Sequence, residues 1–499
     1  MPLSAPGLSL AELVAELAPV HARLAAGGAV SVTDVRHDSR RVEPGDLFVA
    51  RPGTKLDGAR FAADAVARGA LALLAAEETA LPDLGVPVVR VRDVRLALAL
   101  AAEAVHGHPT KQLGVVGITG TNGKTTTTFL VAEAVDAAGG ATARLGTLGY
   151  SFRGDTVDES LTTPEADDVS RFTSRALARG ATHLAMEVSS IALTQARVDA
   201  VSFAVAALTN VTQDHLDYHG SMEAYAKAKA RLFEELSPSA AVINVDDPVG
   251  ATLAERMKGR LLRVGRGTDA DVRPISVRLT GRGIHGAVKL PSGTVELDSE
   301  LVGAHNLDNL LLTLGIVEAL GLPAERAALG LARAKAAPGR LERCSGDQDD
   351  IVVLVDYAHT PDALRRVLEA VRGLTRGAVH CVFGCGGDRD PKKRPKMGEA
   401  ARAAATRITI TSDNPRSEDP AAIAAAIELG LWGAETPYEI VLDRKVAIEN
   451  AIARASPGDL ILIAGKGHEP YQIVGAEKRA FDDRVEARRA LAKRRGEGG

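Results

Sequence analysis

The chain has 499 residues, 45% of them hydrophobic and 25% charged, and a net charge of −4. This length suggests about three domains, and the hydrophobic content is sufficient for several packed cores. The slightly negative charge argues against a nucleic-acid-binding protein. The sequence contains no uninterrupted apolar run of about 18 residues, so no membrane span is predicted. We therefore expect a large globular protein without nucleic-acid partners or membrane insertion, and we expect a monomer.

The three cysteines, Cys344, Cys381 and Cys385, form an odd set without a Cys-x-x-Cys spacing. This pattern indicates neither a disulfide framework nor a structural zinc site. Residues 1–17 lack the basic region and long apolar core of a secretory signal. A reducing cytoplasm is the expected location.

The first predicted domain covers residues 1–108 and has an α/β pattern. Apolar runs at 46–50, 70–75 and 87–91 predict strands, and helical patterns cover 58–69 and 94–106. The sequence His108-Pro109-Thr110 then breaks the chain.

The second predicted domain, residues 109–337, opens with a motif typical of phosphate binding. A strand over 113–118 leads into the sequence from Thr119 to Thr127 and then into a helix. Glycines let backbone N–H groups turn toward an anion, Lys124 can reach terminal phosphates, and Thr125 can offer a hydroxyl to Mg²⁺. Position 118 is isoleucine where the strict G-x-x-x-x-G-K-[ST] spacing has glycine. The motif predicts binding of ATP or a relative through Gly120, Thr121, Asn122, Gly123, Lys124, Thr125 and Thr126.

Further buried strands are predicted at 183–188, 201–208 and 240–245, which favours a doubly wound, mainly parallel sheet. Glycine-punctuated runs between 271 and 302 predict hairpins. Glu187 and His215 follow two of the strands, and both are candidate Mg²⁺ ligands beside Thr125. The alternative is that Glu187 supports a helix cap and His215 belongs to a solvated loop.

The third predicted domain, residues 338–499, follows the break at Ala336-Ala337-Pro338-Gly339. Strands are predicted at 351–355, 378–383, 407–411 and 460–464, each followed by a polar loop. Because open parallel sheets bind ligands outside the carboxyl ends of their strands, these loops should face one cleft.

These motifs resemble those of the Mur ligase family, ATP-dependent amide-forming enzymes of peptidoglycan precursor assembly. The resemblance covers essentially the whole chain. One departure is Ile191-Ala192, expected in a loop, where relatives often have His-Gly. The matching motifs are Asp38-Ser39-Arg40, Pro44-Gly45-Asp46-Leu47-Phe48-Val49-Ala50, Thr119-Gly120-Thr121-Asn122-Gly123-Lys124-Thr125, Leu161-Thr162-Thr163-Pro164, Met186-Glu187-Val188-Ser189-Ser190, Asp214-His215-Leu216-Asp217-Tyr218-His219, His305-Asn306 with Asn309, Gly339-Arg340-Leu341-Glu342, Asp356-Tyr357-Ala358-His359-Thr360-Pro361, Phe383-Gly384-Cys385-Gly386-Gly387-Asp388-Arg389, Asp413-Asn414-Pro415-Arg416 and Gly465-Lys466-Gly467-His468-Glu469.

The resemblance implies three α/β domains. The N-terminal domain would bind UDP, the central one would hold the P-loop in a doubly wound, mainly parallel sheet, and the C-terminal Rossmann-like one would bind an amino acid. The implied reaction adds a diamino acid to UDP-N-acetylmuramoyl-L-alanyl-D-glutamate through an acyl phosphate, with ATP and Mg²⁺. The implied catalytic residues are Lys124, Glu187, His215 and Lys229.

Lys229 matches the family lysine that CO₂ carbamylates, which would turn a cation into a carboxylate-like ligand of a second Mg²⁺. From the residues alone, Lys227 and Lys229 are better explained as ordinary surface lysines, and the resemblance reverses this preference. The implied metal ligands are Thr125, Glu187, His215 and Lys229.

The family match also implies contacts for each ligand. The predicted ATP contacts outside the P-loop are Asn306, Asn309, Arg340 and Asp356. The predicted UDP contacts are His37, Ser39, Thr54, Lys55 and Leu56, and those to the muramoyl peptide are Thr162, Thr163, Ser189, Gln195 and Arg197. The predicted amino-acid contacts are Arg389, Asp413, Asn414, Pro415, Arg416, Gly465 and Glu469.

Arg416 favours meso-diaminopimelate, because an arginine can hold its distal carboxylate with two hydrogen bonds. L-lysine or L-ornithine would place an ammonium group there, but neighbouring residues could compensate. Three more distant alternatives are a folylpolyglutamate synthetase that shares the ATP domain, a regulatory P-loop NTPase, and a sugar-nucleotide-binding module with a vestigial ATP site.

Overall fold

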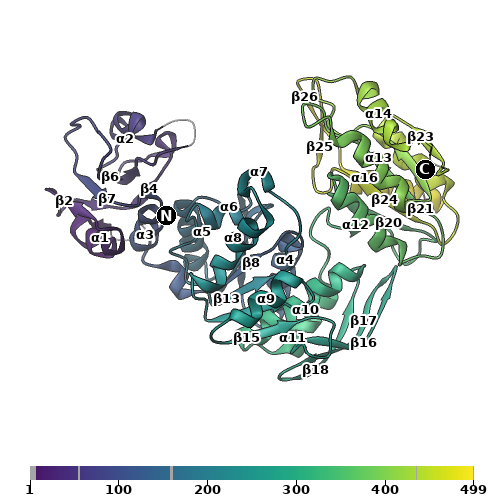
Figure 1. Ribbon diagram of the computed structural model, residues 1–499, viewed down its shortest axis with the longest axis horizontal. Helices are drawn as coiled ribbons and strands as arrows, with labels where there is room; N and C mark the ends of the chain where they lie inside the picture. Colours follow the sequence, from purple (N-terminus) through teal and green to yellow (C-terminus); the bar gives the residue numbers. More distant parts are fainter. Residues whose placement is uncertain (1–6, 54–56, 158–160, 434, 498–499) are drawn as a thin grey trace. The chain divides into compact units, whose positions relative to one another are not determined.

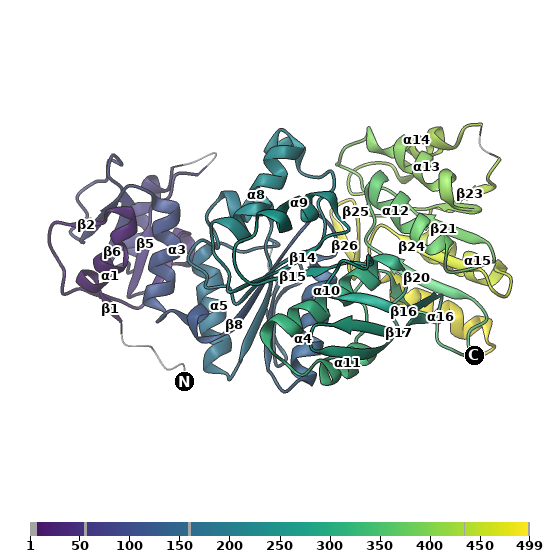
Figure 2. The same cartoon turned by 60° about the horizontal axis from the view of Figure 1, so that its bottom comes forward.

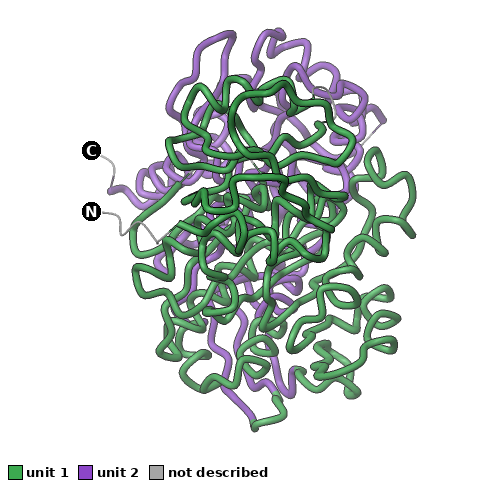
Figure 3. The backbone as a smooth tube through the Cα atoms, turned by 90° about the vertical axis from the view of Figure 1, so that its left-hand side faces the viewer, with its two compact units in different colours: residues 1–273, 289–293, 311–330 green, residues 274–288, 294–310, 331–499 purple. Residues whose placement is uncertain are grey.

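The computed structural model describes residues 7–53, 57–157, 161–433 and 435–497. It divides into two compact units (Figure 3). One unit comprises residues 1–273, 289–293 and 311–330, and the other comprises 274–288, 294–310 and 331–499. Each unit is built around mainly parallel sheets, as the sequence predicts.

The N-terminal part of the first unit contains a five-stranded sheet in the order β2-β7-β6-β5-β4, parallel except for β2. Figure 1 shows α2 on one side of this sheet and α1 and α3 on the other. The apolar contacts agree, since Ala62 packs with Phe48 and Leu73, whereas Leu13 packs with Leu47 and Leu74. The elements are β1 (Leu8–Ser9), α1 (Leu10–Glu16), η1 (Ala18–Val20), β2 (Arg23–Leu24), β3 (Ser31–Val32), β4 (Asp34–Arg36), η2 (Ser39–Arg41), β5 (Asp46–Val49), η3 (Gly58–Phe61), α2 (Ala62–Ala67), β6 (Ala72–Ala76), β7 (Val88–Val91), α3 (Val94–Val105) and η4 (Pro109–Gln112).

The central sheet has eight strands in the order β11-β10-β9-β12-β8-β13-β14-β15. The six strands from β9 to β15 in this order are parallel, and β10 and β11 extend the edge as antiparallel strands. The elements are β8 (Gly114–Thr119), α4 (Lys124–Ala137), β9 (Thr142–Gly146), β10 (Gly149–Phe152), β11 (Asp155–Val157), α5 (Ala166–Ala178), β12 (His183–Glu187), α6 (Ser190–Thr194), β13 (Val205–Leu208), α7 (Leu216–His219), α8 (Met222–Glu234), β14 (Ala240–Asn244), α9 (Pro248–Arg256) and β15 (Leu261–Val264).

The order of this sheet positions the P-loop. Strand β8 lies between β12 and β13, so the segments that follow all three strands meet at one edge of the sheet. Val115 and Leu184 pack against Phe172 of α5 on one face. Since side chains alternate along a strand, Val116 and Ile118 point to the opposite face, which α4 covers.

A three-stranded sheet in the order β16-β17-β18 follows, which confirms the predicted hairpins. Its strands and the next two helices are β16 (Arg273–Thr280), β17 (Gly283–Leu290), β18 (Gly293–Ser299), α10 (Ala304–Leu320) and α11 (Ala324–Arg333).

The C-terminal sheet has six strands in the order β19-β20-β24-β21-β22-β23, parallel except for β19. One face packs against α12, α13 and α14, and the other against α15 and α16 (Figure 2). The elements are β19 (Glu342–Arg343), β20 (Val352–Asp356), α12 (Pro361–Arg372), β21 (Val379–Phe383), α13 (Lys393–Ala404), β22 (Arg407–Ile410), α14 (Pro420–Glu428), η5 (Leu429–Leu431), β23 (Tyr438–Ile440), α15 (Arg444–Arg454), β24 (Leu460–Ala464), β25 (Tyr471–Val474), β26 (Glu477–Ala480) and α16 (Asp483–Arg494).

The predicted strands are confirmed to within a few residues at their ends, and one detail is wrong. Ile191 and Ala192, expected in a loop, lie in α6, which Ser189 caps by accepting a hydrogen bond from the backbone N–H of Ala192. Among the described residues, no helix is long and apolar enough to cross a membrane.

Candidate active site

The P-loop lies between β8 and α4. Gly120 has φ +143° and Gly123, at the start of α4, has φ +87°, a conformation that side chains rarely adopt. A Cβ atom on Gly120 would lie 1.8 Å from Oγ1 of Thr209. Lys124 turns back over the loop, and its Nζ donates to the carbonyl oxygens of Gly120 and Thr121 at 2.9 Å each. The loop therefore has the backbone form that the phosphate-binding prediction requires.

Lys229 lies on α8 and is only 2% exposed. Its Nζ donates to the carbonyl oxygen of Gly120 at 2.8 Å, so it shares this acceptor with Lys124. Burial, followed by the charge of Lys124, holds the pKa of Lys229 well below its ordinary value. The interpretation of Lys229 as a surface lysine is wrong, whereas Lys227 is exposed.

Glu187, the last residue of β12, is buried beside the P-loop. One of its oxygens accepts from Oγ1 of Thr125 at 3.0 Å and from Oγ1 of Thr147 at 3.1 Å. The other accepts from the backbone N–H of Thr147 at 2.9 Å. Gly146 leaves the space for this carboxylate, since a Cβ there would lie 2.2 Å from it. The sequence analysis missed Thr147, although the Gly146-Thr147 pair directly after a strand was a usable signal.

His215 contacts residues outside the cluster formed by Thr125, Thr147 and Glu187. It begins α7 with φ +50°, and its side chain is 47% exposed and 3.6 Å from Asp214. Its ring centroid is 6.4 Å from that of Tyr225, whose hydroxyl contacts Oγ1 of Thr121. Among the described residues, no three His, Cys, Asp or Glu side chains form a group that could hold a metal ion. The role of His215 as an Mg²⁺ ligand stays a prediction.

The residues predicted to hold the muramoyl peptide form a connected chain next to Glu187. Oγ1 of Thr163 donates to the Glu187 carbonyl at 2.9 Å and accepts from the Ser189 backbone N–H at 2.9 Å. Arg197 donates to the Thr163 carbonyl at 2.9 Å and to Oε1 of Gln195 at 2.7 Å. Oγ1 of Thr162 lies 3.2 Å from that of Thr147. The structure thus brings all five predicted residues together.

His37 and Ser39, predicted to contact UDP, lie around the turn η2. Nδ1 of His37 is 2.8 Å from Oδ1 of the buried Asp167 at the start of α5. Burial opposes protonation of His37, but the hydrogen bond and the charge of Asp167 outweigh it and raise the pKa. Ser39 is buried. The other predicted UDP contacts, Thr54, Lys55 and Leu56, lie outside the described residues.

In the second unit, the predicted nucleotide contacts lie near the start of α10 and the end of β20. Asn306 donates to the carbonyl of Val302, and Asn309 donates to Oδ1 of Asn306 at 3.2 Å. Asp356 is buried and accepts from the backbone N–H of Leu341. Burial raises the pKa of Asp356, and the charge of Arg340 partly offsets the rise.

The predicted amino-acid site joins the loops after β21, β22 and β24. Asn414 donates to Oε2 of Glu469 at 2.8 Å, and Arg416 donates to the carbonyl of Gly387 at 2.6 Å. Arg416 has φ +52° and pairs with Val474 in an isolated bridge. A Cβ on Gly386 would lie 3.0 Å from Nη1 of Arg416 and 3.8 Å from Cγ of Arg389. The two predicted arginines therefore flank the same glycine.

Lys466 belongs to the Gly465–Glu469 motif, but the sequence did not predict a role for it. It is fully buried, and its Nζ donates to Oδ1 of Asn414 at 3.0 Å and to Oε2 of Glu469 at 3.3 Å. It lies 3.9 Å from Asp413. This lysine fixes the orientation of the Asn414 amide and balances two carboxylates. Its position between Gly465 and Gly467 was the available signal.

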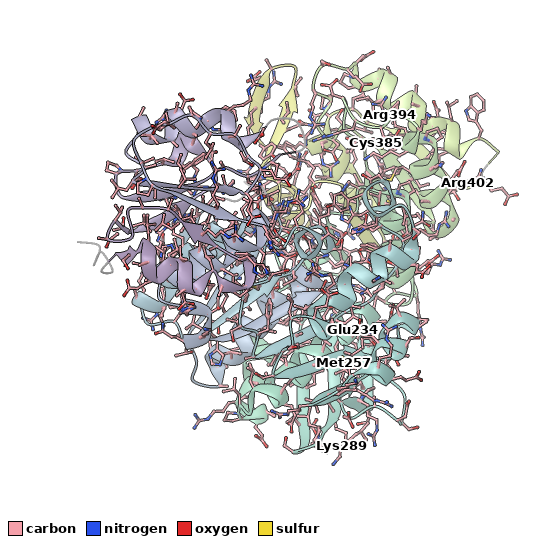
Figure 4. All side chains as sticks on the ribbon, turned by 60° about the vertical axis from the view of Figure 1, so that its left-hand side comes forward. Glu234, Met257, Lys289, Cys385, Arg394 and Arg402 are labelled. Carbon is pink, nitrogen blue, oxygen red and sulfur yellow. The ribbon has the colours of Figure 1, made fainter. Side chains whose placement is uncertain are left out.

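The loop after β21 is supported from α13. Arg394 is 5% exposed and donates to Glu418, which also accepts from the backbone N–H of Asp388. Cys385 and Arg394 are labelled in Figure 4, where Arg402 lies at the surface. Burial raises the pKa of the Cys385 thiol to about 12. The thiol therefore stays protonated and packs as an apolar group.

Comparisons with known proteins agree with this arrangement. Three family models match the chain: "Mur ligase family, catalytic domain" over residues 31–106, "Mur ligase middle domain" over 118–317, and "Mur ligase, glutamate ligase domain" over 339–467. A UDP-N-acetylmuramoyl-L-alanyl-D-glutamate–2,6-diaminopimelate ligase of Gloeobacter violaceus is 45% identical over 94% of this chain and 96% of its own. A relative of the same name from Solibacter usitatus is 44% identical over 97% of both chains.

A solved structure of a UDP-N-acetylmuramoyl-L-alanyl-D-glutamate–2,6-diaminopimelate ligase aligns with a TM-score of 0.74 and 32% identity, over 98% of this chain and 100% of that one. A folylpolyglutamate synthase of Mycobacterium tuberculosis aligns with a TM-score of 0.58 at 20% identity, which shows the shared fold alone. Fold and site define a P-loop α/β enzyme with a second, mainly parallel sheet in the C-terminal part of the chain. The chain belongs to the Mur ligase family and is an ATP-dependent ligase of that family.

Proposed function

We propose that this ligase adds meso-diaminopimelate to UDP-N-acetylmuramoyl-L-alanyl-D-glutamate in peptidoglycan precursor synthesis, with ATP as the energy source. Relatives named as 2,6-diaminopimelate ligases are 42–45% identical and match nearly the whole chain. The observation that carries the choice of amino acid is the approach of Arg416 and Arg389 to Gly386. The Arg416 guanidinium at this glycine suits a carboxylate and disfavours an ammonium group, and the aliphatic part of the Arg389 side chain lies beside the same glycine.

In the proposed reaction, a carboxylate oxygen of the UDP-linked dipeptide attacks the γ-phosphorus of ATP. The bond to the bridging oxygen breaks, and ADP leaves with an acyl phosphate as the other product. The amine of the diamino acid then attacks the acyl carbon, and phosphate leaves. The enzyme's contribution is positioning and charge neutralisation, for which Lys124 and the backbone of the P-loop are placed.

Mg²⁺ fits the residues beside the P-loop. Thr125 and Glu187 present a hydroxyl and a carboxylate oxygen 3.0 Å apart, both typical Mg²⁺ ligands. Bound Mg²⁺ would neutralise charge on the transferring phosphoryl group. Lys229 as a free ammonium could not be a ligand, but its lowered pKa favours the neutral amine, which can react with CO₂ to form a carbamate. We propose this carbamate and His215 as the remaining ligands.

The remaining assignments are part of the same proposal. Asn306, Asn309, Arg340 and Asp356 would bind the nucleotide, and His37 and Ser39 would bind UDP. We place the domain boundaries near residues 108 and 337. The protein would work as a monomer in the cytoplasm, and its three cysteines, all free and buried, fit a reducing compartment.

A phosphate-release assay tests the proposal. Wild-type enzyme, ATP, Mg²⁺ and the UDP-linked dipeptide are mixed with diaminopimelate, L-lysine or L-ornithine in turn. We expect phosphate release with diaminopimelate and little release when either the dipeptide or the amine is omitted. Faster phosphate release with lysine or ornithine would identify that amino acid, rather than diaminopimelate, as the substrate. Equal release without either substrate would indicate a regulatory NTPase, and turnover with folate and glutamate would indicate a folylpolyglutamate synthetase.

A further inference from the structure

The two loops that form most of the amino-acid site follow strands that are not neighbours. Residues 413–416 follow β22 and residues 465–469 follow β24, and β21 lies between these strands. No ladder of backbone hydrogen bonds therefore links β22 to β24 directly. The loops nevertheless meet, since Asn414 contacts both Glu469 and Lys466. Strand pairing links the two strands only through β21, so the loops beyond the strand ends need other contacts to hold their spacing.

Arg444, the first residue of α15, spans the two strands from behind the loops. Its Nη1 donates to the carbonyl oxygen of Ser412 at 3.3 Å, and its Nη2 donates to that of Ala464 at 3.0 Å. Each acceptor directly precedes a residue of the amino-acid site, Asp413 in one loop and Gly465 in the other. The Arg444 side chain is fully buried.

Asp483, the first residue of α16, holds this guanidinium in place. Its two oxygens accept from Nε and Nη2 of Arg444 at 2.7 Å each, and its side chain is also fully buried. The helices α15 and α16 pack together on one face of the sheet (Figure 2). A planar fork with both ends paired leaves the guanidinium a single orientation.

The position of the Arg444–Asp483 ion pair, next to the ends of both strands, suits a role in positioning the two loops. Taking two charges out of water is costly, and a buried ion pair can often be replaced by apolar residues without loss of stability. Arg444 also interacts with the charges of the amino-acid site. Burial alone would lower the pKa of Arg444, but the charge and hydrogen bonds of Asp483 raise it. The carboxylates of Asp413 and Glu469 contribute further to this rise. The cation thus offsets two carboxylates of the amino-acid site.

We propose that Arg444 and Asp483 are positioning residues for the amino-acid site: Asp483 orients the Arg444 guanidinium, which holds the ends of β22 and β24 at the spacing at which their loops form one site. Arg444 touches no substrate in this role. The identity of the bound amino acid rests on the proposed function above, whereas the link between the two loops does not.

The test compares Asp483→Asn with Asp349→Asn. Asp349 is a matched control, because it is a buried carboxylate of the same unit that accepts from Arg495 at 2.6 Å and from the backbone N–H of Gly346. In Asp483→Asn we expect the KM for diaminopimelate to rise about tenfold or more, since small misplacements of reacting groups cost up to about 10²-fold in rate. The KM values for ATP and the UDP-linked dipeptide should stay within about twofold, and Asp349→Asn should leave all three unchanged.

Backbone amide hydrogen exchange provides a readout independent of the reaction. In Asp483→Asn, exchange should rise in residues 412–416 and 464–469 together, and Asp349→Asn should not produce this paired rise. If Asp483→Asn does not fold, Arg444→Lys takes its place, because lysine keeps the charge but cannot reach both carbonyls with a rigid fork.

Two results would overturn the proposal: an unchanged KM for diaminopimelate with unchanged exchange in both loops, or an equal rise of all three KM values in Asp483→Asn and the control. A wild-type enzyme that turns over no diamino acid, with the paired rise in exchange still present in Asp483→Asn, would reject the proposed function and leave the loop link standing.

Discussion

At the scale of single residues, the site is organised by lysines that share acceptors in buried surroundings. Lys124 and Lys229 both donate to the carbonyl oxygen of Gly120, at 2.9 and 2.8 Å. Two ammonium groups at one carbonyl repel each other, and burial of Lys229 adds a desolvation cost. Its pKa falls for these reasons. The lowered pKa makes a neutral amine at Lys229 more accessible.

Lys229→Ala should therefore lose turnover by about 10²-fold or more, as removal of an electrostatic group at a phosphoryl-transfer site does. Lys227→Ala, two residues along the same helix but exposed, is the control and should retain activity. Steady-state phosphate release measures both variants. A short added carboxylate should restore part of the activity of Lys229→Ala only. Full activity in Lys229→Ala would rule out the carbamate.

We propose that Arg416 determines the choice of amino acid. Arg416→Asn should lower the preference for diaminopimelate over L-lysine by about 10²-fold, within the range that lost polar contacts can produce. Asparagine is chosen because it tolerates the positive φ of this position. The ratio of kcat/KM for the two amino acids is the measurement. Arg402→Asn, at an exposed position of α13, serves as the control (Figure 4), and an unchanged ratio in Arg416→Asn would place recognition elsewhere.

At the scale of secondary-structure elements, the P-loop depends on its glycines for two separate reasons. Gly120 needs both its positive φ and the space that Oγ1 of Thr209 would deny to a Cβ. Thr209 itself donates to the carbonyl of Asn122, so it cannot move without breaking the loop. The segment after β13 thus holds the shape of the segment after β8.

Gly120→Ala should weaken ATP binding by at least about tenfold, because the new methyl group displaces Thr209 and with it the loop. Gly139→Ala is a matched control: Gly139 also has a positive φ, +102°, but a Cβ there would meet nothing within 4 Å. Calorimetric titration with a non-hydrolysable ATP analogue measures both. Equal affinities of the two variants would contradict the effect assigned to the clash with Thr209.

At the scale of the whole molecule, the N-terminal and central parts of the first unit are linked by buried charges. Arg171 on α5 donates to both oxygens of Asp34 at 2.8 and 3.0 Å and to Asp168. Arg41 also pairs with Asp168, and Arg51 pairs with Glu165. Because Asp34 lies on β4 while Glu165 and Asp168 lie at the start of α5, the network connects the N-terminal sheet to the helix that packs on the central sheet.

Arg171→Met should destabilise this unit by about 3–5 kcal/mol, the usual cost of breaking a buried network by removal of one partner. The pH dependence should change as well. Burial opposes ionisation of Asp34, but its hydrogen bonds to His106 and Arg171 outweigh this and lower its pKa. A lowered folded pKa contributes stability above the ordinary value near 3.8, which is lost as the pH falls through the folded pKa.

Urea unfolding between pH 2 and 6 measures both effects. The free energy of unfolding of the wild type should fall steeply below about pH 4. In Arg171→Met this free energy should be lower at pH 6 and should fall less steeply as the pH decreases. Arg175→Met is the control, since Arg175 pairs with Asp155 in a half-exposed ion pair that contributes little. Parallel pH profiles of Arg171→Met and wild type would contradict the assigned coupling between Arg171 and Asp34.

The sequence by itself determined the α/β architecture and the approximate limits of eleven of the nineteen described strands in the three large sheets, each of which has a neighbouring strand on both sides. Apolar runs such as 460–464 are short and are bounded by glycine, proline or Asp-Asn-Pro, which favours buried strands over helices. Local chemistry also identified the P-loop, because a glycine-rich turn and its lysine act within a few residues of each other.

Only the tertiary structure decided which side chains are buried together, because burial depends on strand order and on helices far along the chain. Lys229 and Lys227 have the same local pattern, and only packing against Tyr225 and Gly120 distinguishes them. Likewise, nothing near Arg444 in sequence indicates Asp483, 39 residues away, or the two carbonyls between which it lies. Long-range electrostatics and packing are properties of the fold, so they are absent from any local reading of the chain.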